Sequence, residues 1–399
     1  MFLVVLACLA FFSFALPDSM LGVAWPSMRL DFGQPISAAG LVPPVGVAAT
    51  LTSTALAGRL VTRLGVGRLL VASTILSTVG LVLGGLSGSF WMFLGSVVLV
   101  GLAGGAIDTS LNSYAARRLG ARKINFLHAS YGLGAVVSPL IVTLVLQVGA
   151  TWRWSYLIVA ALQAVLSMIF IATRHRWLAG SGAVDHAAAK TPTGPVWSRS
   201  IKINTSIGLL AVGVETGIES GAALWGYTFL TGAVGVGTTT AGVIASGYWA
   251  TMVVGRLLLG ALAERIGAWK VLGLAVAGLV IASGLVLVRS EVTAIVGIVG
   301  FGLATAPIYP LLILTTAERT ADRVVDQVVG LQAGASTVGA ALIPSGIGLL
   351  MGRSLHLFAP AMAALSVLAV LLQMIMRGRR SRSELSRRQE LMLAGEDDG

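Results

Sequence analysis

Long apolar stretches separated by a few polar residues run along almost the whole chain of 399 residues. Each holds roughly 20 residues, the length a helix needs to cross the hydrocarbon core of a bilayer. In the first half they cover 2–25, 37–57, 67–86, 90–116, 124–148 and 153–173. In the second half they cover 203–231, 238–260, 269–288, 291–315, 326–351 and 355–376. The pattern predicts an all-α integral membrane protein with twelve spanning helices.

Composition supports this fold class and narrows the chemistry. Hydrophobic residues make up 56% of the chain and charged residues only 11%, whereas soluble domains carry about 25% charge. The single cysteine, Cys8, excludes an intrachain disulfide and a thiolate metal cluster. The sequence has no phosphate-binding loop with its lysine, no His/Cys cluster at metal-ligand spacing and no Ser/His/Asp arrangement. We therefore expect neither an enzyme nor a protein that depends on a cofactor or metal.

The formal net charge of +11 reflects membrane orientation rather than nucleic-acid binding. Of the 27 Lys and Arg residues, only four fall in loops on one side of the predicted membrane: Arg29, Arg153, Arg289 and Arg353. Except for Arg256, which lies inside a span, the others fall in the opposite loops or the C-terminal tail. Because cytoplasmic loops are enriched in Lys and Arg, both termini are predicted to be cytoplasmic in an inner or plasma membrane. The basic tail suggests a contact with anionic lipid.

A short motif occurs twice at an offset of 202 residues, about half the chain. Residues 58–68 read GRLVTRLGVGR and residues 260–270 read GALAERIGAWK, so both share G-x-L-x-x-R-x-G-x-x-(R/K). Small residues allow a tight turn and close helix packing, and the basic residues hold the turn in the cytoplasm. Two copies between corresponding spans indicate an internal repeat. Residues with an expected gating role are Arg59, Arg63, Arg68, Glu264 and Arg265.

The repeat divides the chain into two pseudo-symmetric bundles of six helices. The predicted units are an N-terminal bundle over 1–173, a cytoplasmic linker over 174–202, a C-terminal bundle over 203–376 and a cytoplasmic tail over 377–399. The linker is polar and contains Pro192 and Pro195. The other loops are short, which leaves no room for a soluble catalytic domain.

Twelve helices in two halves, with this motif after the second and eighth spans, resemble the major facilitator superfamily. The resemblance implies the major facilitator fold, a monomer, and transport of a small molecule by alternating access. The family usually carries Asp where this chain has Thr62, while an acid is kept in the second copy as Glu264. That departure implies a weaker salt-bridge latch in the first half.

A finer resemblance connects the chain to the fucose/galactose–proton symporter branch. It rests on GAIDTSLN at 105–112, NFLHASYGLGA at 125–135, GYW at 247–249 and Gly255-Arg256. In that branch, acids on the first and fourth helices carry proton coupling and substrate binding. Asp108 falls where the family has Glu, Asn112 falls at the family's Asn, and Asp18 falls near the first-helix acid.

Four carboxylates lie inside the predicted spans: Asp18, Asp108, Glu215 and Glu219. A charge at the membrane centre costs several kcal/mol, so each is a candidate for proton coupling. Two alternatives are structural: Asp18 as a helix N-cap after Pro17, and Asp108 as a buried acid bonded to a neighbouring helix. Glu215 and Glu219 share one helical face and should not both be ionised in a low dielectric. They form either a proton or cation site, or a buried Glu215 beside a Glu219 that faces water.

Two further side chains could act with these acids. His128 could pair with Asp108 across a cavity or serve as a structural histidine. Arg256 is expected near the cytoplasmic end of its span, where gating or a structural pair is favoured over substrate contact.

Sugar sites pair flat aromatic rings with Asn, Gln and carboxylates. Besides His128, the candidates for substrate binding are Trp25, Asn112, Tyr131, Trp225, Tyr227, Trp249, Tyr309 and Gln332. For any one aromatic residue, packing or a place at the membrane interface is an alternative. The pair Trp225 and Tyr227 is favoured, because it follows both Glu residues on a glycine-rich span that could break over a substrate.

The sequence thus predicts proton-coupled import of a small polar solute, with a sugar as the first candidate. One alternative is proton-driven export of a metabolite or drug-like compound. The Gly-Pro signature of drug–proton antiporters is not reproduced at 134–139, which disfavours drug efflux. A non-transporting receptor or scaffold is the alternative of another class.

Overall fold

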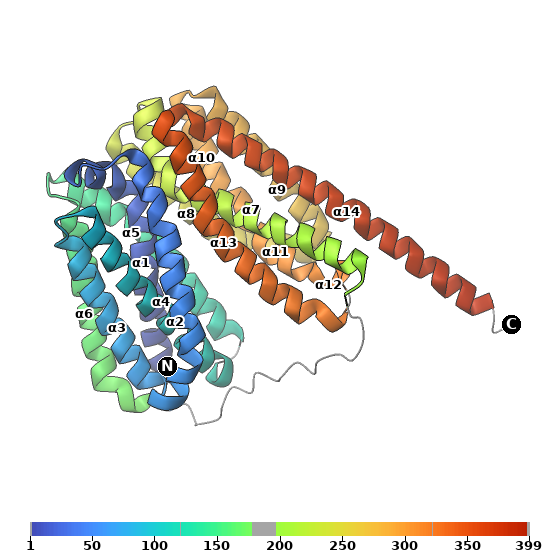
Figure 1. Cartoon of the computed structure of the whole chain (residues 1–399), viewed down its shortest axis with the longest axis horizontal. Coiled ribbons are helices and arrows are strands. Elements are labelled where there is room, and N and C mark those ends of the chain that lie inside the picture. Colours follow the sequence, from blue (N-terminus) through green and yellow to red (C-terminus); the bar gives the residue numbers. More distant parts are fainter. Residues whose placement is uncertain (1, 120, 178–196, 321, 397–399) are drawn as a thin grey trace.

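The computed structural model describes residues 2–119, 121–177, 197–320 and 322–396 (Figure 1). Within these residues, twelve helices are long and apolar enough to cross a membrane, which confirms the predicted all-α membrane fold. Helices suit this setting because they satisfy every backbone N–H and C=O within one segment, and the bilayer core offers no water to do so.

The first half contains six long helices. They are α1 (Phe2–Asp31), α2 (Val42–Leu64), α3 (Val66–Gly85), α4 (Phe90–Arg118), α5 (Ala121–Gln147) and α6 (Arg153–Thr173). Two short 3-10 segments, η1 (Ile36–Leu41) and η2 (Arg174–Arg176), precede α2 and follow α6. The first span is longer than predicted, because Pro17 and Pro26 are accommodated inside α1 rather than ending it.

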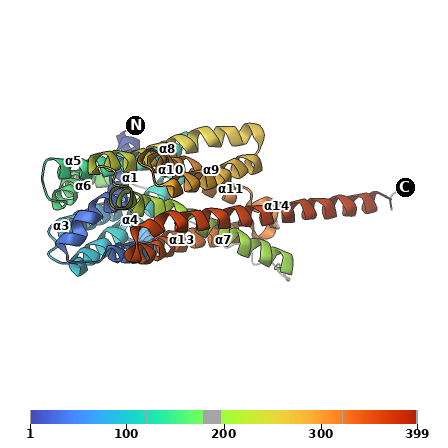
Figure 2. The same cartoon turned by 90° about the horizontal axis from the view of Figure 1, so that it is seen from above.

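The second half follows the same order with more interruptions. It contains α7 (Arg199–Phe229), a π-helical turn η3 (Leu230–Val234), α8 (Thr238–Ile266), α9 (Ala268–Val288), α10 (Glu291–Thr305), α11 (Ile308–Leu314), α12 (Thr316–Arg319), η4 (Asp322–Val324), α13 (Val325–Arg353), η5 (Leu355–Leu357) and α14 (Phe358–Glu396). The predicted span over 291–315 is interrupted at Ala306 and Pro307, which separate α10 from α11. The predicted tail continues α14 as a helix to Glu396, beyond the other helices (Figure 2).

The two motif copies form the same one-residue turn. Gly65 alone joins α2 to α3, with φ 76° and ψ 159°. Gly267 alone joins α8 to α9, with φ 95° and ψ 142°. Positive φ of this kind is readily available only to glycine, which explains the shared glycine of the motif.

The helices of the two halves meet at one end and diverge toward the other (Figure 1). At the closed end, defined here by the loops 32–35, 148–152 and 235–237, Ser345 Oγ donates to Gly40 O at 2.5 Å and Gln147 Nε2 donates to Thr239 Oγ1 at 2.7 Å. A Cβ on Gly22 would lie 2.6 Å from Ala223 O, so α1 and α7 also touch through their backbones. The open end carries the turns at Gly65 and Gly267. The predicted linker 174–202 falls largely on 178–196, which lie outside the described residues.

A charged cluster ties the first half together at the closed end. The Asp31 carboxylate accepts hydrogen bonds from Trp152 Nε1 at 2.9 Å and from the Arg153 guanidinium. Arg153 also donates to Ser87 O at 2.7 Å and lies 4.6 Å from the Trp152 ring centroid. The Asp31 carboxylate therefore links the end of α1 to the start of α6, and Arg153 extends this link to the α3–α4 loop.

Replacing Asp31 with Asn should lower the stability of the first half. Both partners in the ion pair are partly exposed, so we expect a loss of about 1–2 kcal/mol rather than the larger effect of a fully buried pair. The measurement is thermal unfolding of the detergent-purified protein. Glu291→Gln, at an exposed acid outside this cluster, should stay within about 0.5 kcal/mol. Equal unfolding of both variants would contradict the role given to Asp31.

Candidate functional site

Asp18 faces the space between the two halves. It lies in the middle of the continuous helix α1, so it is not the N-cap considered from the sequence. Its carboxylate accepts a hydrogen bond from the Tyr131 hydroxyl of α5 at 2.8 Å, and the side chain is exposed. An exposed carboxylate halfway along a spanning helix needs a polar or water-filled surrounding, because lipid offers no hydrogen bonds.

Glu219 and Arg256 form an ion pair in the second half. Arg256 Nη2 of α8 lies 3.8 Å from Glu219 Oε1 of α7, with side-chain exposures of 51% and 17%. The Tyr248 hydroxyl donates to the main-chain oxygen of Glu219 at 2.9 Å, which fixes α8 against α7 beside the pair. Arg256 thus pairs with an acid of α7, which is one of the roles that the sequence favours for it.

Charges from both halves meet around Tyr131. Asp18, Glu219 and Arg256 are all close enough to interact electrostatically with the Tyr131 hydroxyl. We call Asp18, Tyr131, Glu219 and Arg256 the central polar cluster. It joins helices α1 and α5 to α7 and α8, so it spans the boundary across which the two halves would move.

Glu215 is separated from this cluster although it precedes Glu219 by one turn. Its side chain is 1% exposed. Oε2 accepts a weak hydrogen bond from Thr216 Oγ1 at 3.3 Å, and Oε1 has no hydrogen-bond partner. The geometry resembles the alternative in which Glu215 is buried and Glu219 reaches an open space.

Asp108 belongs to a second polar group within the first half. Its Oδ1 accepts a hydrogen bond from Asn112 Nδ2 at 2.9 Å, one turn later on α4. His128 of α5 is close enough to interact electrostatically with Asp108, and its ring lies edge-on to Phe11 at 5.4 Å. His128 is exposed and Asp108 is partly buried. The sequence-predicted neighbours Asp108, Asn112 and His128 therefore do lie together.

Several predicted ligand-binding side chains instead bond to the protein itself. Trp225 is fully buried and donates to Pro344 O at 2.7 Å. Trp25 is also fully buried and donates to Ile36 O at 2.8 Å. Gln332 is buried and accepts from Thr316 Oγ1 at 2.9 Å, away from the central polar cluster. In this state the indole N–H groups of Trp25 and Trp225 are satisfied within helix contacts, which fits the packing alternative, and their role in substrate binding stays a prediction.

The other predicted aromatics are placed differently. Tyr227 is buried in a continuous α7, so the predicted break of that span is not present in this structure. Trp249 is partly buried and lies 5.3 Å from the Tyr248 ring. Tyr309 is partly buried and within electrostatic reach of Glu215.

The predicted gating residues of the two motif copies lie at the open end. Arg59, Arg63, Arg68, Glu264 and Arg265 are all exposed. In the part of the chain that the structure describes, none of these five forms an ion pair. The first-copy Thr62 donates to Arg59 O at 2.8 Å, a bond within its own helix. The latch expected from the motif is therefore disengaged where the halves diverge.

Two polar residues of the second half were missed from the sequence. Arg319 is 7% exposed, and its guanidinium donates to Leu312 O at 2.6 Å and Thr315 O at 3.2 Å. Burial lowers the pKa of the Arg319 guanidinium to about 10. Gln373 lies inside the last span on α14, where a lone polar residue was the only available signal. The sequence places Arg319 among the cytoplasmic loop charges, because sequence alone does not show burial.

A family model described as "Major Facilitator Superfamily" matches residues 7–227, more than half of the chain. A search of curated proteins found no match. Among solved structures, a variant of the nucleoside transporter NupG has a TM-score of 0.77 at 14% identity, covering 93% of this chain and 98% of its own.

Two other solved transporters have the same fold. A bacterial homologue of the human lysosomal transporter Spinster, in an inward-facing and unoccupied conformation, has a TM-score of 0.72 at 15% identity and covers 95% of both chains. A variant of the peptide transporter POT in complex with alafosfalin has a TM-score of 0.76 at 14% identity, covering 94% of this chain and 93% of its own.

Twelve spanning helices, with charged groups from both halves between them, define a membrane transporter rather than an enzyme. The chain belongs to the major facilitator superfamily, and it is a secondary transporter. The named structural neighbours are nucleoside, Spinster-type and peptide transporters and not fucose/galactose symporters, so the family is established at the coarser level.

Proposed function

We propose that this protein imports a small, neutral, polar solute together with protons, and that a sugar is the first candidate substrate. The observation that carries the proposal is the central polar cluster, in which Asp18 and Glu219 approach Tyr131 from opposite halves. Acids within the spanning region that change protonation as the halves rock against each other would couple the proton gradient to the exposure of a solute.

The charge balance around the cluster supports a neutral solute. Arg256 is paired with Glu219, whereas Asp18 accepts a hydrogen bond from Tyr131 and forms no ion pair within the described part of the chain. With carboxylates in excess, an anionic substrate would be repelled. Hydroxyl, amide and carboxylate groups at Asp18, Tyr131 and Asn112 instead offer the donors and acceptors that a hydroxyl-rich solute needs.

The same proposal fixes an orientation in an inner or plasma membrane. If the positive-inside rule applies, the open end with the Gly65 and Gly267 turns faces the cytoplasm, together with both termini. The structure would then represent an inward-facing state, as in the Spinster homologue. We also propose that the protein is a monomer and that its basic tail contacts anionic lipid. The structure does not describe the tail side chains beyond Arg379.

The test is external pH in a lightly buffered suspension of cells expressing the protein, while solutes are added one at a time. Sugars come first, followed by nucleosides and dipeptides, the solute classes suggested by the neighbours' names. We expect alkalinisation with one solute and its loss in Asp108→Asn, which removes the acid bonded to Asn112. Asp326→Asn, at an exposed acid in the first turn of α13, should preserve the signal.

One outcome would revise the proposal, and another would contradict it. Unchanged alkalinisation in Asp108→Asn would show that Asp108 is not required for proton coupling. Absence of a signal with every solute would favour the exporter, and efflux of metabolites and drug-like compounds would be measured next.

A further inference from the structure

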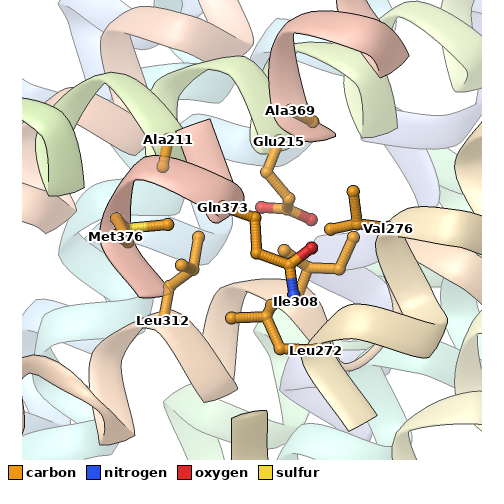
Figure 3. A pocket seen from close by; sticks show the side chains of 9 residues that line it. All are labelled: Ala211, Glu215, Leu272, Val276, Ile308, Leu312, Ala369, Gln373 and Met376. Atoms are coloured by element: carbon orange, nitrogen blue, oxygen red, sulfur yellow. The ribbon is translucent and has the colours of Figure 1, made fainter. Parts of the chain in front are cut away.

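A small pocket lies inside the second half, between helices α7, α9, α11 and α14 (Figure 3). Most of its lining is apolar, with side chains such as Val276 and Leu312. Glu215 of α7 and Gln373 of α14 are the exceptions, and their carboxylate and amide groups point toward each other across the pocket (Figure 3).

The Glu215 carboxyl group lacks a hydrogen-bond partner for one of its oxygens at this pocket. Its side chain is 1% exposed, and Oε1 lacks a hydrogen-bond partner. An unsatisfied buried oxygen costs about 1–3 kcal/mol, and more when it carries charge. The pocket has room for about one water molecule, which could bridge Oε1 to the Gln373 amide.

The few oxygen atoms that line the pocket suit a proton better than a metal cation. Hard cations take six or more oxygen ligands, whereas Glu215 and Gln373 are the only side chains in the lining that offer oxygen. The described part of the chain also contains no group of three His, Cys, Asp or Glu residues placed to hold a metal ion. A protonated carboxylic acid needs only one acceptor for its O–H, which a bridging water supplies.

The charged and titratable groups around Glu215 favour the neutral acid in this state. Glu219 lies one turn away and repels a second negative charge. Arg256 is the one cation that interacts with Glu215 among the described residues, and its guanidinium is engaged with Glu219. Tyr248 and Tyr309 also lie within electrostatic reach but carry no positive charge.

We propose that Glu215, Gln373 and one bridging water form a proton-holding site inside the second half, distinct from the central polar cluster. In this state Glu215 carries the proton, and Glu219 remains ionised beside Arg256. The site deepens the proposed function, on which its role in transport rests, because it assigns the two neighbouring acids different protonation states. Gln373 is a positioning residue: through the water, it keeps the protonated acid bonded within an apolar lining.

Infrared spectroscopy of the detergent-purified full-length protein tests this site without a substrate. A protonated carboxyl gives a C=O stretching band that carboxylates lack and that shifts in D₂O when its proton exchanges. We expect Glu215→Gln to lose one such exchangeable band at neutral pH. Glu219→Gln should keep it. A spectrum in which Glu215→Gln retains every carboxyl band of the parent protein would overturn the proposal.

Gln373→Leu provides an independent arm if Glu215→Gln fails to fold. Without the amide that anchors the water, the carboxyl group loses its hydrogen bonding and its C=O band should move to higher wavenumber. Leu365→Met on α14, at a residue that does not line the pocket, should leave the band in place. If the C=O band does not move in Gln373→Leu, no water bridges Glu215 to Gln373, and the proposed site is wrong.

These results are separable from the proposed function. The infrared band could be assigned to Glu215 while none of the added solutes causes alkalinisation. That result would support the proton-holding site and refute proton-coupled import. If the parent protein alkalinises the medium with a solute but Glu215→Gln has an unchanged carboxyl spectrum, proton-coupled import is supported and the proton-holding site is refuted.

Discussion

Gly22→Val should prevent the closed end from sealing and should suppress transport. A Cβ at Gly22 would lie 2.6 Å from Ala223 O and 3.0 Å from Leu224 O. Both contacts are with the backbone of α7, so no side-chain rotation relieves them. Overpacking of this kind costs about 1–3 kcal/mol. Because the cost applies only while α1 and α7 are in contact, the equilibrium should shift by about 5- to 150-fold toward the state that is open at this end.

Thiol labelling measures this shift before any substrate is known. Thr143 of α5 is 6% exposed, and a Cβ on Gly242 of α8 would collide with it, so it marks the seam between the halves. A Thr143→Cys reporter, in a Cys8→Ser background that removes the single native thiol, is treated with a maleimide that does not cross the membrane. With Gly22→Val, we expect the labelling rate from outside the cell to rise at least about tenfold.

Gly95→Val is the matched control, because no atom lies within 4 Å of a Cβ at that position on α4. It makes the same change in helix propensity and hydrophobicity on another spanning helix, and we expect no faster labelling. If Gly22→Val labels as slowly as Gly95→Val, the α1–α7 contact does not control the closed end. Faster labelling only from the cytoplasmic side would reverse the proposed orientation.

The helices and their turns were predictable because their signals are local. Twenty apolar residues with no water to hydrogen-bond the backbone leave a helix as the favoured conformation. The doubled motif also indicated tight turns, and Gly65 and Gly267 make them with positive φ. The end of α1 was misplaced for a related reason: a proline inside a membrane helix is tolerated, so Pro26 does not mark a boundary.

The partners of the candidate site were less predictable, because they depend on which face of each helix meets which neighbour. The four intramembrane acids could be identified from their desolvation cost alone. Nothing local indicates that Asp18 bonds Tyr131 from 113 positions away, or that Glu215 and Glu219 face different surroundings. The sequence neighbours of Trp225 favour ligand binding, but they do not show that its indole donates a hydrogen bond to Pro344 O of α13.

Arg256→Gln should cause the second large loss, because it leaves Glu219 without its counter-ion. Without that cation, nothing offsets the desolvation of the Glu219 carboxylate, so the neutral acid would persist through the cycle. We expect proton-driven accumulation of the solute found by the pH screen to fall at least about tenfold. Exchange of labelled for unlabelled solute at equal concentrations needs no net proton movement and should be largely retained.

A double-mutant cycle separates pairing from a general loss of structure. Glu219→Gln should also lower both proton-driven accumulation and stability, since it leaves the Arg256 cation unpaired near the middle of the membrane. If the two charges act as a pair, combining Glu219→Gln with Arg256→Gln should cost less stability than the two single changes added together. For a pair that is 3.8 Å apart and half exposed at Arg256, the interaction in thermal unfolding should be about 1 kcal/mol. Strictly additive losses would mean that the two residues act independently. Accumulation should stay low in the double variant, because neutralising both charges restores stability but not the ionised acid that the coupling requires.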